Sequence, residues 1–392
     1  MTLLRFPAAL LLALPVSTAL AEPVLPGVGA AMEEMIAKKE VAGAVTAVVG
    51  KDGLLHLESH GFADVAGGRE MTPDTLFWIA SMSKPVTGAA VLMLQDEGKL
   101  KTSDPVSKYL LEFADLKTPS GRPANLTITH VLTHTSGLRE ADVAAAGVDT
   151  LAGLVPLWLS GPTQFEPGTE WKYCQSGINT AARIVEVVGG MPFDQFLEER
   201  LFGPLGMKDS GFYPDDAQRS RLAVPYAKDK ESGELAPAPA RAGYEGTRNR
   251  PPQGNGGLFS TPRDYARFCQ MLLAGGTLDG HRYLSEEAVL SLGTPQTGDI
   301  PVGFFQSEEY GKHGMDYGWS FGTCVLKTPH EGAAAMLSPG TFGHGGAWGT
   351  QAWIDPVKKV AYVLMVQRSN FPNSDASPVR QAFQEAAAKA LP

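Results

Sequence analysis

The chain has 392 residues, of which 43% are hydrophobic and 19% are charged, so it can bury a core in two packed lobes. Its formal net charge at pH 7 is -9, and its basic residues form no run longer than a pair, so no nucleic-acid partner is expected. The three cysteines allow at most one disulfide and include no C-x-x-C pair. These counts exclude a disulfide-stapled scaffold and a cysteine metal cluster.

Residues 1–21 predict a secretory signal peptide. Arg5 precedes a short apolar run, and Ala19 and Ala21 form a small-x-small cleavage site. The run is shorter than the roughly 20 residues that span a membrane, and prolines interrupt it. We therefore expect an exported protein, periplasmic or secreted, without stable membrane insertion.

The elements that follow predict a hairpin and then a helix. A helical pattern over 29–40 leads into two apolar strands, 42–49 and 54–60, joined by a turn that contains Asp-Gly, which is typical of an antiparallel hairpin. The next helix begins at Ser81 and ends near residue 98.

The segment 102–257 predicts a helical lobe, because it shows helical patterns without a clear pair of strands. Gly-Pro and Pro-Gly pairs mark the turns between its helices. Its last part, 228–257, is rich in proline and glycine, and we interpret it as a loop that forms a lid or rim over the site. The helical patterns lie at 106–113, 127–132, 151–159 and 176–188.

The C-terminal part predicts mainly strands, at 318–327, 333–337, 347–354 and 360–366, between a helix from 261 and a helix over 377–390. The connectors are mostly too short for parallel crossovers. The expected fold class is therefore α/β of the α+β type, with a mostly antiparallel sheet flanked by helices. Residues 22–101 and 258–392 would form the sheet lobe, and the helical lobe 102–257 would be inserted between them.

Three stretches suggest acyl-transfer chemistry. Ser81 and Lys84 share one face of the first turn of a helix, where an amine can activate a hydroxyl and the helix dipole favours negative charge. Tyr173 and Gln175 follow a Pro-Gly turn at the start of another helix, and residues 343–347 form a glycine-rich entry into a strand. A single S-x-x-K occurs by chance about once in a chain of this size, so the combination carries the signal.

With these stretches, and with 132–138 and 255–262, nearly all of the mature chain resembles the serine β-lactamase and penicillin-binding-protein superfamily. The resemblance is to the branch of class C β-lactamases, family VIII esterases and D-aminopeptidase-like hydrolases, whose motifs are S-x-x-K, Y-x-N and K-T-G. It implies a nucleophilic serine that acts without a metal or cofactor on a small-molecule ester or amide. The implied roles are Ser81 as nucleophile, Lys84 and Tyr173 as its proton-transfer partners, the N–H groups of Ser81 and Ala347 as the oxyanion hole, and Gln175, His344, Gly345 and Gly346 as substrate-binding residues.

Two departures from the family motifs favour an esterase. Gln175 replaces asparagine, and His344-Gly-Gly replaces Lys-Thr-Gly. A histidine with an ordinary pKa near 6.5 is mostly neutral at pH 7, so it offers a weaker partner than lysine for the carboxylate of a β-lactam or peptide. The alternatives are a class C-like β-lactamase, a D-amino-acid peptidase or amidase, and a catalytically silent binding module. The sequence leaves open the oligomeric state and whether Lys84 or Tyr173 is the base.

Two other features have simpler interpretations. His130 and His134 have the i, i+4 spacing of a zinc site, but no third ligand or adjacent glutamate accompanies them, so no metal is expected there. Cys174 lies in the second motif and is interpreted as a packing residue, and Trp319, Trp348 and Trp353 as mostly core.

Overall fold

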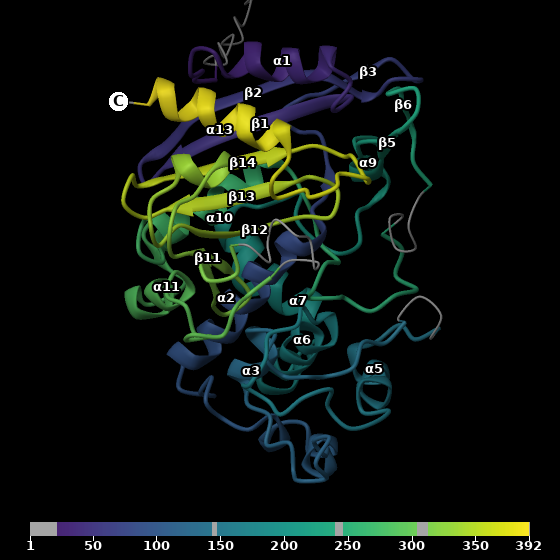
Figure 1. The fold of residues 1–392 in the computed structure, drawn as a ribbon, viewed down its shortest axis with the longest axis vertical. Coiled ribbons are helices and arrows are strands. Elements are labelled where there is room, and N and C mark those ends of the chain that lie inside the picture. The colour runs from purple at the N-terminus through teal and green to yellow at the C-terminus, as the bar shows by residue number, and fades with distance from the viewer. Residues whose placement is uncertain (1–21, 143–146, 240–245, 304–312, 392) are drawn as a thin grey trace, which may run out of the picture.

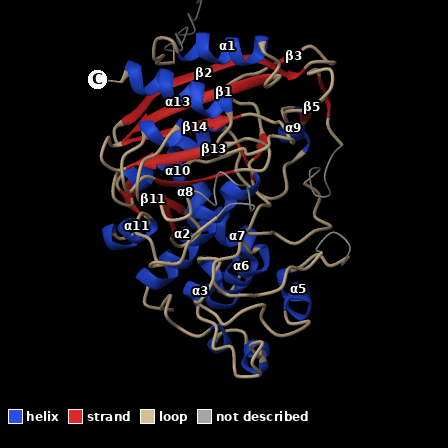
Figure 2. Cartoon of the chain, in the orientation of Figure 1, coloured by secondary structure: helices blue, strands red, loops and turns tan. Residues whose placement is uncertain are grey.

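The computed structural model describes the chain except for residues 1–21, 143–146, 240–245, 304–312 and 392. An eight-stranded sheet with the order β10-β11-β12-β13-β14-β1-β2-β3 dominates one half of the molecule, and helices dominate the other (Figures 1 and 2). Every neighbouring pair in this sheet is antiparallel. The fold class is therefore as predicted, whereas the predicted signal peptide lies outside the described residues.

The strands of the large sheet are β1 (Gly43–Gly50), β2 (Gly53–Asp64), β3 (Arg69–Glu70), β10 (Tyr317–Trp319), β11 (Cys324–Leu326), β12 (Phe342–Gly345), β13 (Gln351–Asp355) and β14 (Val360–Met365). The strands of three small two-stranded sheets are β4 (Phe77–Trp78) with β7 (Phe259–Ser260), β5 (Tyr226–Lys228) with β6 (Leu235–Pro237), and β8 (Thr277–Leu278) with β9 (His281–Arg282).

The α-helices among the described residues are α1 (Val28–Ala37), α2 (Ser83–Asp96), α3 (Ile128–Leu132), α5 (Leu151–Trp158), α6 (Gln175–Gly189), α7 (Phe193–Leu197), α8 (Gly203–Leu205), α9 (Asp216–Ser220), α10 (Pro262–Leu273), α11 (Glu286–Leu292) and α13 (Pro378–Ala390). Shorter helical segments are the 3-10 turns η1 (Ala80–Met82), η2 (Val106–Lys108), η3 (Leu111–Asp115) and η5 (Gly332–Met336), and the π-helical turn η4 (Glu198–Phe202).

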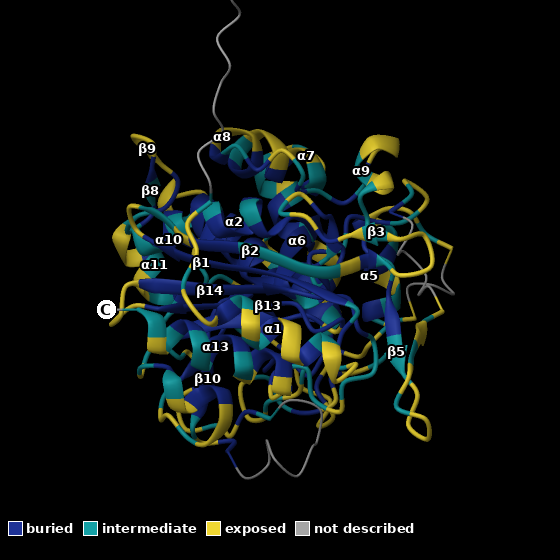
Figure 3. Cartoon of the chain, turned by 90° about the horizontal axis from the view of Figure 1, so that it is seen from above, coloured by how far each residue is buried: buried dark blue, intermediate teal, exposed yellow. Residues whose placement is uncertain are grey.

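Strand β1 lies inside the sheet, between β14 and β2, and joins the N-terminal and C-terminal parts of the chain. Val45 pairs with Ser59 on β2 and with Met365 on β14, so the N-terminal hairpin and the late strands form one sheet. Alternate side chains of a strand point to opposite faces, and both faces of β1 are covered. Val45 packs in the core on the α10 side, and Val48 packs in the core on the side of α1 and α13 (Figure 3).

Helix α2 connects the sheet to the helical half. Its residues from Ser83 to Leu94 are all buried, and it packs against α6 and α11. A helix that is buried around its whole circumference belongs to the core. Its first turn is therefore held rigidly at the junction of the two halves.

Several predicted elements differ from the structure. The predicted strand 333–337 falls largely in the 3-10 turn η5 (Gly332–Met336), because a run of alanines favours helical over extended backbone. The predicted strand 318–327 is the hairpin β10–β11, since Gly322 has a φ of 78° and Ser320 N–H donates to the Thr323 carbonyl to close a turn. The predicted helix 106–113 consists of the 3-10 turns η2 and η3.

The loop 228–257 begins with the β5–β6 hairpin, and its residues 240–245 lie outside the described part, so a lid role stays a prediction. All three cysteines are buried thiols without a disulfide. Of the helices in the described residues, none has the length and apolar character needed to cross a membrane.

Candidate active site

Ser81 lies in η1, directly before α2. Ala80 has a φ of 45°, a left-handed conformation that is uncommon for a residue with a side chain and that costs on the order of 1–2 kcal/mol. The Ser83 hydroxyl donates to the Ala80 carbonyl at 2.7 Å and accepts from Leu258 N–H at 3.1 Å, which fixes this turn. The strained turn leaves Ser81 partly exposed among buried neighbours.

The Lys84 amine lies beside the Ser81 hydroxyl. Its Nζ is 3.1 Å from Ser81 Oγ and donates to the Asn255 carbonyl oxygen at 2.6 Å. Lys84 is fully buried, and this burial holds the pKa of its amine well below the usual value, although the charge of Glu140 acts in the opposite direction. A neutral amine at this position can donate to Asn255 and accept a proton from Ser81.

Tyr173 closes the other side of the amine. Lys84 Nζ lies 4.6 Å from the centre of the Tyr173 ring, and Tyr173 Oη lies 3.2 Å from His344 Nε2. Burial raises the pKa of Tyr173 well above its usual value, and a hydrogen bond with Ser81 lowers it by less. Burial therefore keeps the phenol protonated and the amine neutral, since in both groups it disfavours the charged form.

His344 is buried at the end of β12 and is neutral. Its Nδ1 lies 2.6 Å from the Gly345 carbonyl oxygen, so Nδ1 carries the hydrogen and Nε2 accepts from the Tyr173 hydroxyl. Burial, and then the charge of Lys84, hold the pKa of the imidazole well below its usual value. A substrate carboxylate would therefore find no permanent cation in this side chain at pH 7.

The glycines after His344 allow the end of β12 to approach other backbone segments closely. A Cβ on Gly345 would lie 1.8 Å from Asp375 Oδ1, and a Cβ on Gly346 would lie 2.5 Å from the Ile79 carbonyl oxygen, two residues before Ser81. Ala347 follows in an exposed turn. The close contact with Ile79 thus sets the position of the Ala347 backbone relative to Ser81.

Gly346→Ala is expected to lower kcat for any Ser81-dependent substrate by about 100-fold, because a misplacement of about 1 Å has an effect of that size. The added methyl must push the 346–350 turn away from Ile79, whose carbonyl belongs to rigid backbone. Gly211→Ala is the matched control, since a Cβ there would meet nothing within 4 Å. Equal kcat values for the two variants would contradict this role of the contact.

The structure adds polar groups around Gln175 and Lys84 that the sequence did not identify. Asn255 Nδ2 donates to Gln175 Oε1 at 2.9 Å, while Asn179 Oδ1 accepts from Asn255 N–H at 3.2 Å. The glycine-rich stretch at 254–257, which ends the predicted loop 228–257, therefore forms part of the site. Glu140 accepts from the N–H groups of Gln175 and Ser176 at the N-terminus of α6, where the helix dipole favours a carboxylate.

The i, i+4 histidine pair serves two separate structural roles. His130 Nδ1 accepts from Thr127 N–H and thereby caps α3. His134 is fully buried, accepts from Cys174 N–H at 3.0 Å and packs against the Tyr173 ring with centroids 4.5 Å apart. Burial lowers the pKa of His134 well below its usual value, so its imidazole is neutral where it packs against the Tyr173 ring.

The aromatic and thiol residues near the site pack in the core. Burial raises the pKa of Cys174 to about 12, so its thiol is protonated, and its sulfur accepts from Gly177 N–H at the start of α6. Trp319, Trp348 and Trp353 are at most 2% exposed, as predicted. Trp319 also packs against Tyr173, with ring centroids 5.9 Å apart.

A family model described as "Beta-lactamase" matches residues 28–387. The chain belongs to the Beta-lactamase family. Protein Rv1367c of Mycobacterium tuberculosis is 32% identical over 375 residues, covering 88% of this chain and 90% of that protein. Esterase EstB of Burkholderia gladioli is 28% identical over 371 residues, covering 86% and 88%. The solved structure of EstCE1, a hydrolase with promiscuous acyltransferase activity, is similar with a TM-score of 0.76 at 21% identity, covering 92% of this chain and 97% of that one.

Ser81, Lys84, Tyr173 and the end of β12 meet at one place in the structure. The serine-lysine motif spans η1 and the start of α2, and the tyrosine precedes α6. Helices α2 and α6 lie below the sheet in Figure 1, and the third motif comes from the end of β12. Family membership supports a serine hydrolase, and the choice among ester, β-lactam and peptide depends on the local chemistry.

Proposed function

We propose that this protein is a carboxylesterase that acts through an acyl-enzyme on Ser81. The observation that carries the proposal is the buried Lys84 amine, 3.1 Å from Ser81 Oγ, in a site whose third-motif side chain is the neutral His344. The relative named Esterase EstB supports the same activity.

In the proposed acylation step, Lys84 Nζ takes the proton from Ser81 Oγ while Oγ forms a bond to the ester carbonyl carbon. The N–H groups of Ser81 and Ala347 stabilise the resulting oxyanion. Collapse of the intermediate breaks the bond to the leaving alkoxide, which takes a proton from Tyr173. The phenolate recovers that proton from the Lys84 ammonium, so the amine is neutral again. Water then attacks the acyl-enzyme with the same proton transfers, and the carboxylic acid leaves.

The lack of a permanent positive charge at the third motif favours esters over β-lactams. Both classes present a carbonyl to the nucleophile, but β-lactams and peptide termini also carry a carboxylate that needs a cation. A hydrogen bond to a charged group contributes about 1.5–3 kcal/mol, so its loss lowers the rate on such substrates by about 10- to 100-fold. A neutral ester has no carboxylate and loses nothing from the substitution of lysine by His344.

The test compares a short-chain p-nitrophenyl ester with a chromogenic cephalosporin, using the protein without residues 1–21. The expected kcat/KM for the ester exceeds that for the cephalosporin by at least about 10-fold, and Ser81→Ala abolishes turnover of both. Faster turnover of the cephalosporin would overturn the esterase proposal in favour of a β-lactamase. If Ser81 is not labelled by a fluorophosphonate and neither substrate is hydrolysed, the chain is a silent binding module. Labelling without turnover of either substrate would favour a D-amino-acid peptidase.

A further inference from the structure

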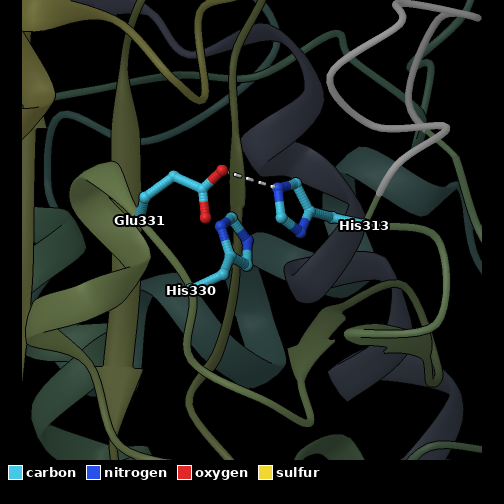
Figure 4. A group of neighbouring side chains, drawn as sticks. All are labelled: His313, His330 and Glu331. Carbon is cyan, nitrogen blue, oxygen red and sulfur yellow. Dashed lines mark hydrogen bonds and ion pairs between the residues drawn. The ribbon is translucent and has the colours of Figure 1, made fainter.

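A second cluster of ionisable side chains lies on the hairpin that forms one edge of the large sheet. His313 precedes β10, and His330 and Glu331 follow β11. The two imidazole rings stack with centroids 3.9 Å apart and an angle of 10° between their planes. Figure 4 shows the Glu331 carboxylate beside both rings.

In each imidazole one ring nitrogen is held by an outer partner, and the other nitrogen belongs to the cluster. His313 Nδ1 lies 2.7 Å from Asp316 Oδ2, and His330 Nε2 lies 2.8 Å from the Tyr317 hydroxyl. His313 Nε2 lies 3.3 Å from Glu331 Oε1, whereas His330 Nδ1 is buried without a hydrogen-bond partner. The unpaired Nδ1 leaves a position that a ligand or a water molecule can fill.

We propose that His313 Nε2, His330 Nδ1 and the Glu331 carboxylate bind a divalent transition-metal ion of the zinc type. Two imidazoles and a carboxylate form a donor set that suits Zn²⁺, which leaves its fourth position to water. Histidine ligands of metals usually hold their other nitrogen through a carboxylate or another polar group, as Asp316 and Tyr317 do here.

Binding requires the stack of the two imidazoles to open, because an imidazole nitrogen binds a metal in the plane of its own ring and two parallel rings cannot both point at one ion. The three ligand atoms lie within 4.8 Å of one another. Bonds of about 2.0–2.2 Å to one ion would bring them to within about 4 Å. The Glu331 side chain is 65% exposed, so it can move by that amount, and a neighbouring cavity of about 80 Å³ has room for a water ligand.

The charges around the cluster favour a cation. The carboxylates of Asp316 and Glu331 face the cluster, and Arg380 is the positive side chain among the described residues that line the cavity. The Arg380 guanidinium donates to the Asp375 carbonyl and lies over the Trp353 ring, so it does not neutralise Glu331 directly. A bound ion would join the two ends of the β10–β11 hairpin, and its binding is independent of the proposed esterase activity.

The experiment measures zinc binding to chelator-treated protein without a histidine tag, by calorimetry and by metal content after dialysis. We expect about one Zn²⁺ per chain, a rise in Tm with ZnCl₂ and no rise with MgCl₂ at the same concentration, since Mg²⁺ prefers oxygen ligands. His330→Phe retains the ring stack and should weaken zinc binding by about 100-fold or more. Glu331→Gln, an exposed and nearly isosteric change, should weaken it by about 10-fold or more.

The matched control is His281→Ala, which removes an exposed histidine on β9 and should leave zinc affinity unchanged. Circular dichroism of each variant separates loss of the ligand from loss of the fold. No retained zinc in the wild-type protein would overturn the proposal. Folded His330→Phe and Glu331→Gln variants that bind zinc like the wild type would also overturn it, because the ion would then lie elsewhere.

Discussion

Lys84→Met is expected to lower kcat/KM on the best ester substrate by about 10²- to 10⁴-fold, the usual contribution of a general base. Methionine has nearly the same length and fills the same buried space, so Ser81 keeps its surroundings but loses the amine 3.1 Å from its hydroxyl. The measurement is steady-state hydrolysis beside the wild type, with fluorophosphonate labelling as a second readout of Ser81 reactivity.

The pH dependence distinguishes a base from a packing residue. The active form of Lys84 is the neutral amine, and burial lowers its pKa well below the usual value, so wild-type activity should be present at neutral pH. As the pH falls through this lowered pKa the amine becomes protonated, and activity should be lost on the acid side. Lys84→Met should lose most of the rate, and its residual activity should no longer fall as the pH decreases through this range.

Lys172→Met is the matched control. Lys172 is exposed next to Tyr173 in the sequence, and its amine donates to Gln164 Oε1 outside the site. This variant should keep the wild-type rate and the same loss of activity at acidic pH. A Lys84→Met protein with the wild-type rate and pH profile would show that another group activates Ser81.

The periodic and motif-bearing parts of the chain were predictable from sequence. The N-terminal hairpin and the buried helix α2 have apolar patterns that depend on local spacing, so β1, β2 and α2 lie within a few residues of their predicted positions. The S-x-x-K spacing likewise places Lys84 over Ser81, because residues three apart share one face of a helical turn.

The remaining site residues depend on contacts between distant segments. Asn255 holds Lys84 through a backbone carbonyl, which any residue could supply, so its side chain gives no signal of this role. Glu140 binds the N-terminus of α6 from 35 positions away in the sequence. His313 and His330 are brought together only because β10 and β11 pair as a hairpin, which the sequence suggested was one strand.

The burial of Lys84 and Tyr173 bears on a question that the sequence left open, namely which of them is the base. Two basic groups with ordinary pKa values near 10 could each serve as the base. Burial acts on them in opposite directions, since it lowers the pKa of Lys84 and raises that of Tyr173. The proposed division of roles follows: Lys84 takes the proton from Ser81, and Tyr173 delivers a proton to the leaving group.

Tyr173→Phe is therefore expected to lower kcat by about 10²- to 10⁴-fold while the aromatic packing is retained. The phenyl ring still fits against His134 and Trp319, but His344 Nε2 loses the hydroxyl at 3.2 Å. Loss of this hydrogen bond should also lower the free energy of unfolding by about 0.5–1.5 kcal/mol. The measurements are steady-state kinetics and urea unfolding.

Tyr362→Phe on β14 is the matched control, because its hydroxyl is buried without a hydrogen-bond partner and its removal leaves no group unsatisfied. It should keep the wild-type rate and equal or greater stability. The leaving group tests the role of Tyr173 itself. Esters of poorly acidic alcohols need a proton on the departing oxygen more than p-nitrophenyl esters do, so the loss in Tyr173→Phe should be larger for alkyl esters. An equal loss on both would assign Tyr173 to activation of Ser81 instead of protonation of the leaving alcohol.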